Sequence, residues 1–181
     1  QLLADCVWQG AYLRAMEENL PVDAKYKNFA RGGESPIAVA EQVRGGGDNT
    51  IHVEAVTGTA LNSASTITTG AGADEITISG GGDGLVGAST ISTGAGDDVI
   101  TLTAQANGIG ENSHILAGEG NNTVSVEAVY GTTMYTDSSI TAGGGNDVIS
   151  LAGAGNGLQT RCKIDASGGH NTITVNVDGY A

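Results

Sequence analysis

The chain has 181 residues, of which 30 are glycine and 2 are proline, and its formal net charge at pH 7 is −13. The length is sufficient for one domain with a hydrophobic core, and the negative charge argues against binding to nucleic acid or anionic lipid while it favours cations. The sequence contains no run of 18 apolar residues, so it predicts no membrane-spanning helix.

The first 34 residues differ in character from the rest. Apolar positions between Leu2 and Leu20 fall on one face of a helix, and Pro21 is expected to end that helix. We predict that residues 1–34 form a helical cap, because the open end of a stacked β structure has to be covered. Two alternatives are a partner-binding segment and a remnant of a preceding domain. Ser35–Val43 is predicted to form a lead-in strand.

A nine-residue motif then recurs six times at a spacing of 24 or 25 residues. Its copies are Gly45–Val53, Gly70–Ile78, Gly94–Leu102, Gly118–Val126, Gly143–Leu151 and Ser167–Val175. A fixed period of this length indicates one structural unit that is copied and stacked, because a single unit buries too little apolar surface to fold alone. Residues 35–181 are therefore predicted to form an all-β, parallel β-solenoid (a β-roll or β-helix) of about six coils.

Each coil is predicted to contain two strands separated by the glycine turn. The first strand carries one inward aliphatic residue per coil: Ile67, Ile91, Ile115, Ile140 and Ile164. The second strand carries aliphatic residues in alternation, which places them on one face. These pairs are Ile51/Val53, Ile76/Ile78, Ile100/Leu102, Val124/Val126, Ile149/Leu151 and Ile173/Val175. A longer return follows, with predicted turn glycines at Gly58, Gly84, Gly108, Gly131 and Gly157.

The sequence contains two cysteines, Cys6 and Cys162. Cys162 occupies a position that serine holds in the four preceding coils, two residues before the inward isoleucine of the first strand. The four serines are Ser65, Ser89, Ser113 and Ser138. Because the two residue types are similar in size, we predict that Cys162 is a small buried thiol; a disulfide with Cys6 is the alternative.

The glycine turn combines glycines with acidic or amide side chains. Its clearest copies read GAGADEI (residues 70–76), GAGDDVI (residues 94–100) and GGGNDVI (residues 143–149). This motif resembles the calcium-binding nonapeptide of the RTX (hemolysin-type) family, G-G-x-G-x-D-x-U-x. In that family, glycine carbonyls and aspartate side chains of stacked turns enclose Ca²⁺, an ion that takes six to eight oxygen ligands.

The resemblance implies that Asp74, Asp98 and Asp147 are ligand positions for Ca²⁺, and Asp97 is expected close by. The complete candidate metal site consists of Asp74, Asp97, Asp98, Asp147, Gly70, Gly72, Gly94, Gly96, Gly143 and Gly145. The chain departs from the family pattern in having one nonapeptide per coil, whereas RTX repeats run in tandem every nine residues. At most one column of calcium sites is therefore expected. Three of the six turns carry asparagine at the aspartate position: Asn49, Asn122 and Asn171.

The second and third turns are adjacent, so Asp74 and Asp98 are expected to lie about 5 Å apart. Two carboxylates at that distance repel by roughly 3.5 kcal/mol at an effective dielectric constant near 20, and protonation, separation or a cation must relieve this repulsion. Residues 45–160 contain twelve Asp and Glu and no Lys or Arg, so Ca²⁺ is the expected counter-ion. The alternative is a metal-free ladder of Asn and Asp side chains along the turns. His170 is expected to be a solvated turn residue.

These features predict a secreted or cell-surface module with a structural or adhesive role, stabilised by Ca²⁺. The resemblance implies a bacterial, exported protein, and a cell-surface or glycan partner would suit such a role. One alternative is a metal-free module that binds glycan or ice through an outward hydroxyl row. That row consists of Thr77, Thr101, Ser125, Ser150 and Thr174. The other is a polysaccharide-active β-helix enzyme, but we predict no enzymatic activity because residues 45–160 offer no basic residue for such a site.

Overall fold

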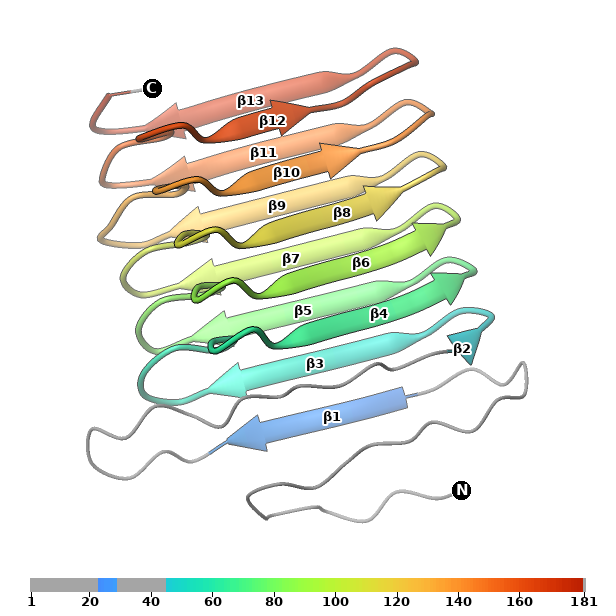
Figure 1. The fold of residues 1–181 in the computed structure, drawn as a ribbon, viewed down its shortest axis with the longest axis horizontal. Coiled ribbons are helices and arrows are strands. Elements are labelled where there is room, and N and C mark those ends of the chain that lie inside the picture. The colour runs from blue at the N-terminus through green and yellow to red at the C-terminus, as the bar shows by residue number, and fades with distance from the viewer. Residues whose placement is uncertain (1–22, 29–44, 181) are drawn as a thin grey trace.

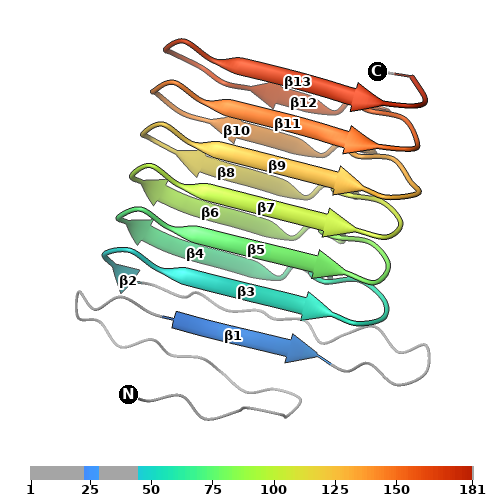
Figure 2. The same ribbon diagram turned by 180° about the vertical axis from the view of Figure 1, so that it is seen from behind.

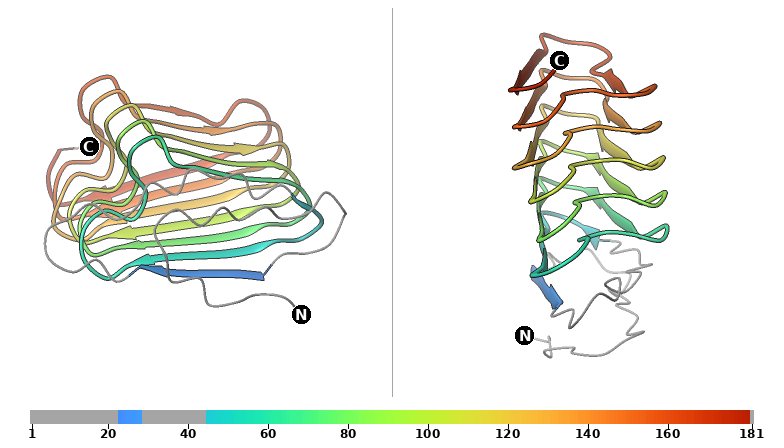
Figure 3. Two further views of the ribbon diagram at one scale, coloured as in Figure 1. Left: turned by 60° about the horizontal axis from the view of Figure 1, so that its bottom comes forward. Right: turned by 90° about the vertical axis from the view of Figure 1, so that its left-hand side faces the viewer.

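The computed structural model describes residues 23–28 and 45–180, which form a column of stacked coils (Figure 1). Each coil contributes one strand to each of two parallel sheets, and Figures 2 and 3 show these sheets as two layers of the column. The seven-stranded sheet has the order β1 (Asp23–Asn28), β3 (Thr50–Ala55), β5 (Glu75–Gly80), β7 (Val99–Ala104), β9 (Thr123–Ala128), β11 (Val148–Gly153) and β13 (Thr172–Val177). The six-stranded sheet has the order β12 (Lys163–Asp165), β10 (Ser139–Ala142), β8 (His114–Gly118), β6 (Thr90–Ala95), β4 (Thr66–Ala71) and β2 (Gly45–Gly46).

All strand pairs are parallel, and equivalent positions of the sequence repeat pair with one another. Ile76 of β5 pairs with Ile100 of β7, which pairs in turn with Val124 of β9. The prediction of an all-β, parallel solenoid is thus confirmed. The stack comprises about five turns, where the sequence predicted about six coils.

The hydrophobic core lies between the two sheets and is built from columns of aliphatic residues. Ile91 of the first strand type and Ile100 and Leu102 of the second are fully buried, as the alternation predicted. A further column comes from the return, where short bridges join successive coils. Its members are Leu61, Leu85, Ile109, Met134 and Leu158. The return therefore supplies a third side of the core in every coil.

The alignment of the return glycines was partly wrong. The main chain of Gly82 pairs with that of Gly58, and the main chain of Gly155 pairs with that of Gly131, so Gly58 and Gly131 belong to a different column from Gly84. Thr133 stands in the column of Gly84, Gly108 and Gly157 instead. The length of the return varies between coils. The register is therefore marked by the aliphatic residue that follows this column, such as Leu85 or Met134, and not by a glycine.

The predicted helical cap over residues 1–34 is not supported. Residues 1–22 and 29–44 lie outside the described part of the chain, as do the helix predicted from Leu2 to Leu20, the lead-in strand Ser35–Val43 and Cys6. The described segment of the cap is strand β1, which pairs in parallel with β3 over six residues. A strand satisfies the main-chain groups at the edge of β3, which a helix cannot do. No helix among the described residues is long and apolar enough to cross a membrane.

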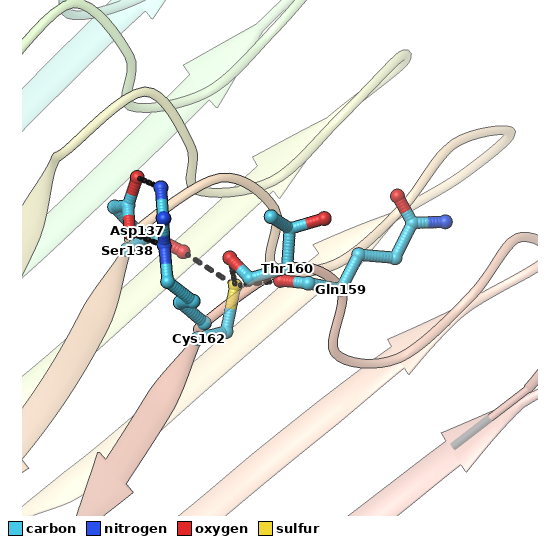
Figure 4. A network of polar contacts seen from close by, with 6 residues as sticks. Asp137, Ser138, Gln159, Thr160 and Cys162 are labelled. Carbon is cyan, nitrogen blue, oxygen red and sulfur yellow. Dashed lines mark hydrogen bonds and ion pairs between the residues drawn. The ribbon is translucent and has the colours of Figure 1, made fainter.

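A sharp corner connects each return to the next strand of the six-stranded sheet. Two consecutive residues without glycine adopt positive φ in several coils, for example Thr136 (41°) and Asp137 (59°). A serine follows the corner, and its hydroxyl closes it: Ser89 Oγ donates to the carbonyl of Val86 at 2.7 Å. In the last coil Cys162 takes this role, since Sγ contacts the Gln159 carbonyl at 2.6 Å and Ser138 Oγ at 3.3 Å (Figure 4). The serine-like position predicted for Cys162 is confirmed, and the thiol is free and half-buried.

Candidate cation site at the glycine turns

One position of the glycine turn points inward in every coil, and we call its residues the inner column. They are Asn49, Asp74, Asp98, Asn122, Asp147 and Asn171. The first five are 1–2 % exposed. The side-chain Oδ1 of each later member accepts the main-chain N–H of the member one coil earlier, with N–O distances of 2.8–3.1 Å. The column is therefore a continuous ladder that ties neighbouring coils together.

The residue before each inner-column member points outward, and these residues form the outer column. Its bonding members are Asp48, Asp97, Asn121 and Asn146, whose Oδ1 atoms accept the main-chain N–H of the next coil. The donors to the first and last of these are Ala73 and His170. The hydrogen bonds of the outer column thus run in the opposite direction to those of the inner column. His170 is exposed, as predicted.

Glycine is required in the turn because successive turns approach at main-chain distance. At Gly96, where φ is +137°, an added Cβ would lie 1.9 Å from the carbonyl oxygen of Gly72. Gly94, with φ of +98°, would meet the carbonyl oxygen of Gly70 at the same distance. Residues with a side chain are excluded on both counts. The glycine carbonyl oxygens of one turn therefore lie directly against the glycines of the next turn.

The asparagines of the inner column satisfy these carbonyls. Asn122 Nδ2 donates to the carbonyl oxygens of Gly118 and Gly120, at 3.1 and 3.2 Å. Asn171 Nδ2 makes the same kind of contact with the carbonyls of its own turn. In Asn122 and Asn171 the carboxamide oxygen therefore bonds between coils and the nitrogen bonds within the turn.

The side chains of the inner-column aspartates are not fully hydrogen-bonded. The Oδ2 atoms of Asp74, Asp98 and Asp147 are buried and have no hydrogen-bond partner. Because Oδ1 makes the same ladder bond in both residue types, Oδ2 takes the place of the asparagine amide nitrogen, which in Asn122 donates to two glycine carbonyls. A buried charged oxygen in that setting is strongly unfavourable. Neutralisation of Oδ2 by a proton or a cation would remove this cost.

The surroundings of Asp98 disfavour the charged form of its carboxyl group. Burial raises the pKa of its carboxyl above the ordinary value, and the charges of Asp74 and Asp97 raise it further. Hydrogen bonding by Thr93 and by the main-chain N–H of Asp74 acts in the opposite direction. The Thr93 hydroxyl also donates to the carbonyl of Ala117 at 2.8 Å.

The structure brings some of the predicted ligand residues together and separates others. Asp74 and Asp98 are neighbours in the inner column and are joined by a hydrogen bond. Asp147 is instead flanked by asparagines, because it bonds to Asn122 on one side and to Asn171 on the other.

The remaining predicted residues have different settings. Asp97 belongs to the exposed outer column, where its Oδ1 accepts from both nitrogens of Asn121. Gly70, Gly72, Gly94 and Gly96 flank the Asp74–Asp98 pair, whereas Gly143 and Gly145 accompany the isolated Asp147. Among the described residues, no group of three or more His, Cys, Asp or Glu side chains is arranged to hold a metal ion. Any site would therefore depend on main-chain oxygens.

The buried threonines beside the turn were missed by the sequence analysis. Thr69 and Thr93 are 2 % and 0 % exposed, and each hydroxyl donates to a carbonyl of the next coil. A signal was available, because threonine precedes the Asp74 and Asp98 turns at a position that is alanine before Asn122. Comparison of the chain with protein families, with curated proteins and with solved structures gives no match.

Proposed function

We propose that the chain is a structural or adhesive β-solenoid module of the cell surface or the extracellular space, and that one Ca²⁺ stabilises it between the Asp74 and Asp98 turns. The observation that carries the proposal is the pair of buried, unpartnered Oδ2 atoms on two adjacent turns. The strongly acidic composition favours cation binding, and the RTX-like turn motif supports an exported role.

The oxygen atoms around this pair suit calcium. The candidate ligands are the Oδ2 atoms of Asp74 and Asp98 and the carbonyl oxygens of Gly70, Gly72, Gly94 and Gly96. Six oxygen ligands, of which two are anionic, lie within the range that Ca²⁺ accepts. When bound, the ion would neutralise both carboxylates and cross-link two coils.

The asparagine turns argue for one ion rather than a column of ions. In those turns the amide nitrogen already donates to a glycine carbonyl. Asp147 has an asparagine turn on either side and thus only one carboxylate to offer. Within residues 45–180, Asp74 and Asp98 are the one pair of adjacent inner-column residues that both carry a buried Oδ2 without a hydrogen-bond partner.

Thermal unfolding in excess chelator and in 5–10 mM Ca²⁺, a range chosen to span weak extracellular sites at about 0.1–1 mM affinity, tests this proposal. Saturating calcium at about ten to a hundred times the dissociation constant should raise the unfolding temperature by about 3–10 °C. Mg²⁺ at equal concentration should have a much smaller effect, since it demands a smaller octahedral site.

A matched pair of variants locates the ion. Asp98→Asn keeps the Oδ1 acceptor for the Asp74 N–H but removes one anionic ligand, so the calcium-dependent shift should disappear. Asp97→Asn removes the same charge one residue away on the exposed outer column, and the shift should persist. An unchanged unfolding temperature of the parent chain on adding Ca²⁺ would rule the proposal out.

A metal-free binding module is the second candidate, and one observation favours it. The outward hydroxyl row of the seven-stranded sheet is in register, since Thr77 pairs with Thr101, Thr101 with Ser125, and Ser125 with Ser150. Such a flat, regular face suits a repetitive ligand such as a crystalline glycan or ice. Co-sedimentation with insoluble polysaccharide and measurement of thermal hysteresis, each compared with a Thr101→Lys variant, distinguish this role from a purely structural one.

A further inference from the structure

One position of the outer column cannot form a side-chain bond to the next coil. Asp48 bridges the first and second glycine turns. Asp97, Asn121 and Asn146 bridge the third to sixth turns in succession. Ala73 occupies the same position in the second turn, and its methyl group offers no acceptor to the next coil. Within residues 45–180, the gap between the second and third turns is therefore the one that lacks an outer side-chain bond.

The same gap contains the aspartate pair of the inner column. Asp74 belongs to the second turn and Asp98 to the third, and each has a buried Oδ2 atom without a hydrogen-bond partner. In each of the other four gaps an outer side-chain bond is present and one inner-column residue is asparagine. The missing outer bond thus coincides with the candidate cation site.

The interruption at Ala73 is one residue wide. Before it, the main-chain N–H of Gly72 donates to the carbonyl of Ala95 at 2.9 Å. After it, the main-chain N–H of Asp74 donates to Asp98 Oδ1, also at 2.9 Å. Ala73 is exposed, whereas the two aspartates are 2 % and 1 % exposed. The buried carboxylates therefore have their weakest cover at Ala73, between two intact bonds.

Negative charge surrounds the interruption. The outer-column neighbours of Ala73 are Asp48, one coil earlier, and Asp97, one coil later, and both are exposed. The outer residues of the later turns are asparagine or histidine, so the acidic members of the outer column are these two. Carboxylates at a rim raise the local concentration of cations. The outer column therefore attracts cations at the place where its bonding is interrupted.

We propose that the Ala73 position is the entrance through which a cation reaches the Asp74–Asp98 pair, an inference that rests on the calcium site proposed above. Because both Oδ2 atoms are buried, entry requires local separation of the second and third turns. Separation is easiest where a hydrogen bond between the turns is absent. Ala73 thus controls the rate of exchange without contributing a ligand.

Ala73→Asn should close this entrance, because asparagine at the same position of later turns bonds to the next coil, as Asn121 and Asn146 do. The new bond has to break before the ion passes in either direction, so association and dissociation of Ca²⁺ should both slow by about two- to tenfold. The dissociation constant should change by less than about twofold, since the bond is present with and without the ion. Line-shape analysis of the Asp74 and Asp98 amide NMR signals during a Ca²⁺ titration measures the rates and the constant together.

Asn146→Ala is the matched control. It removes the acceptor of the His170 N–H and so creates the same interruption between the fifth and sixth turns, a gap without the aspartate pair. The rates of Ca²⁺ exchange should remain those of the parent chain, because the variant loosens a turn but leaves the entrance as it is.

Amide hydrogen exchange in chelator tests the entrance without calcium. In the parent chain the Asp97 N–H should exchange faster than the N–H groups of Ala73 and Asn121, which donate to outer-column side chains at 2.8 and 2.7 Å. In Ala73→Asn the Asp97 N–H should become protected as well. The same spectra verify that each variant keeps its fold.

The possible failures can be told apart. A parent spectrum that does not change on adding Ca²⁺ would refute both the calcium site and its entrance. Calcium binding with equal rates in the parent and in Ala73→Asn would refute the entrance alone, as would an Asp97 amide that is already protected in the parent. Loss of binding in Ala73→Asn would also refute it, because the position would then belong to the ligand set. A change of rate in Asn146→Ala as large as that in Ala73→Asn would assign the effect to the flexibility of the whole stack.

Discussion

The Oδ1 atom of Asp98 accepts a hydrogen bond of 2.9 Å from the main-chain N–H of Asp74, the residue at the same position one coil earlier. The other oxygen of the same carboxylate is buried and has no partner. One side chain therefore both holds two coils together and carries a group that destabilises the turn until something neutralises it.

Asp147→Asn should stabilise the protein in the absence of calcium. The variant keeps the Oδ1 acceptor for the Asn122 N–H and replaces an unpartnered Oδ2 with an amide that can donate to glycine carbonyls, as Asn122 does. We expect the free energy of unfolding in chelator at pH 7 to rise by about 1–3 kcal/mol, measured by urea denaturation. Asp97→Asn, at an exposed position, should change it by no more than about 0.5 kcal/mol. A destabilised Asp147→Asn would mean that the carboxylate has a partner after all.

Stability should fall as the pH rises through the titration of Asp98. Burial raises the pKa of this carboxyl in the folded state above its ordinary value, so folding favours its protonated form. Its contribution is fully present below the unfolded pKa and is lost as the pH passes the higher folded pKa. Unfolding in chelator, followed from pH 3 upward, should show this loss, and Asp98→Asn should remove that component of the pH profile. An identical profile in the parent and the variant would contradict it.

Gly96→Ala should be among the most damaging single substitutions in the turns. The new Cβ would lie 1.9 Å from the Gly72 carbonyl oxygen, at a φ of +137°. Positive φ and steric overlap together should cost about 3 kcal/mol or more, which thermal unfolding would detect. Gly168→Ala is the matched control, because a Cβ there meets no atom within 4 Å, and its effect should be small. Equal effects of the two variants would argue against the close packing of turns.

Ile100→Ala and Val99→Ala should differ sharply although the residues are adjacent. Ile100 is fully buried in the core, whereas Val99 faces outward and is 42 % exposed. Removal of the buried side chain should cost about 3–4 kcal/mol, and removal of the exposed one less than about 1 kcal/mol. Urea denaturation of both variants measures the difference. A reversed order would mean that β7 lies in the sheet with its other face inward.

The sequence was sufficient to predict the solenoid because the period and the alternation agree. The spacing of 24 or 25 residues predicted the length of one coil. The alternation of apolar residues, as in Ile100 and Leu102, predicted which face of the second strand is buried. A metal-free ladder of Asn and Asp side chains along the turns was the alternative to a calcium site. The division into an inner and an outer column was not predicted, and the bonds between coils mostly join side-chain oxygens to main-chain N–H groups.

Three features could not be predicted for identifiable physical reasons. The corners at Thr136 and Asp137 adopt positive φ without glycine, so the usual composition signal for such a corner is missing. The return glycines Gly58 and Gly131 are each the single glycine of their return and stand in a different column from Gly84, so the glycine pattern did not reveal the register. The helix-like pattern between Leu2 and Leu20 led to the prediction of a helical cap that included Asp23–Asn28. This segment is a strand instead, because pairing with β3 outweighs the conformational preference of the isolated segment.

The opposed hydrogen bonds of the inner and outer columns have a consequence for the growth of such a stack. A helix gathers partial charge at its two ends because all its peptide dipoles point the same way. Here the side-chain bonds of one column run toward the first coil and those of the other toward the last, so their dipoles along the axis largely cancel. Duplication of whole coils would therefore add length without building up opposite poles, and electrostatics at the termini would set no upper limit on the number of repeats.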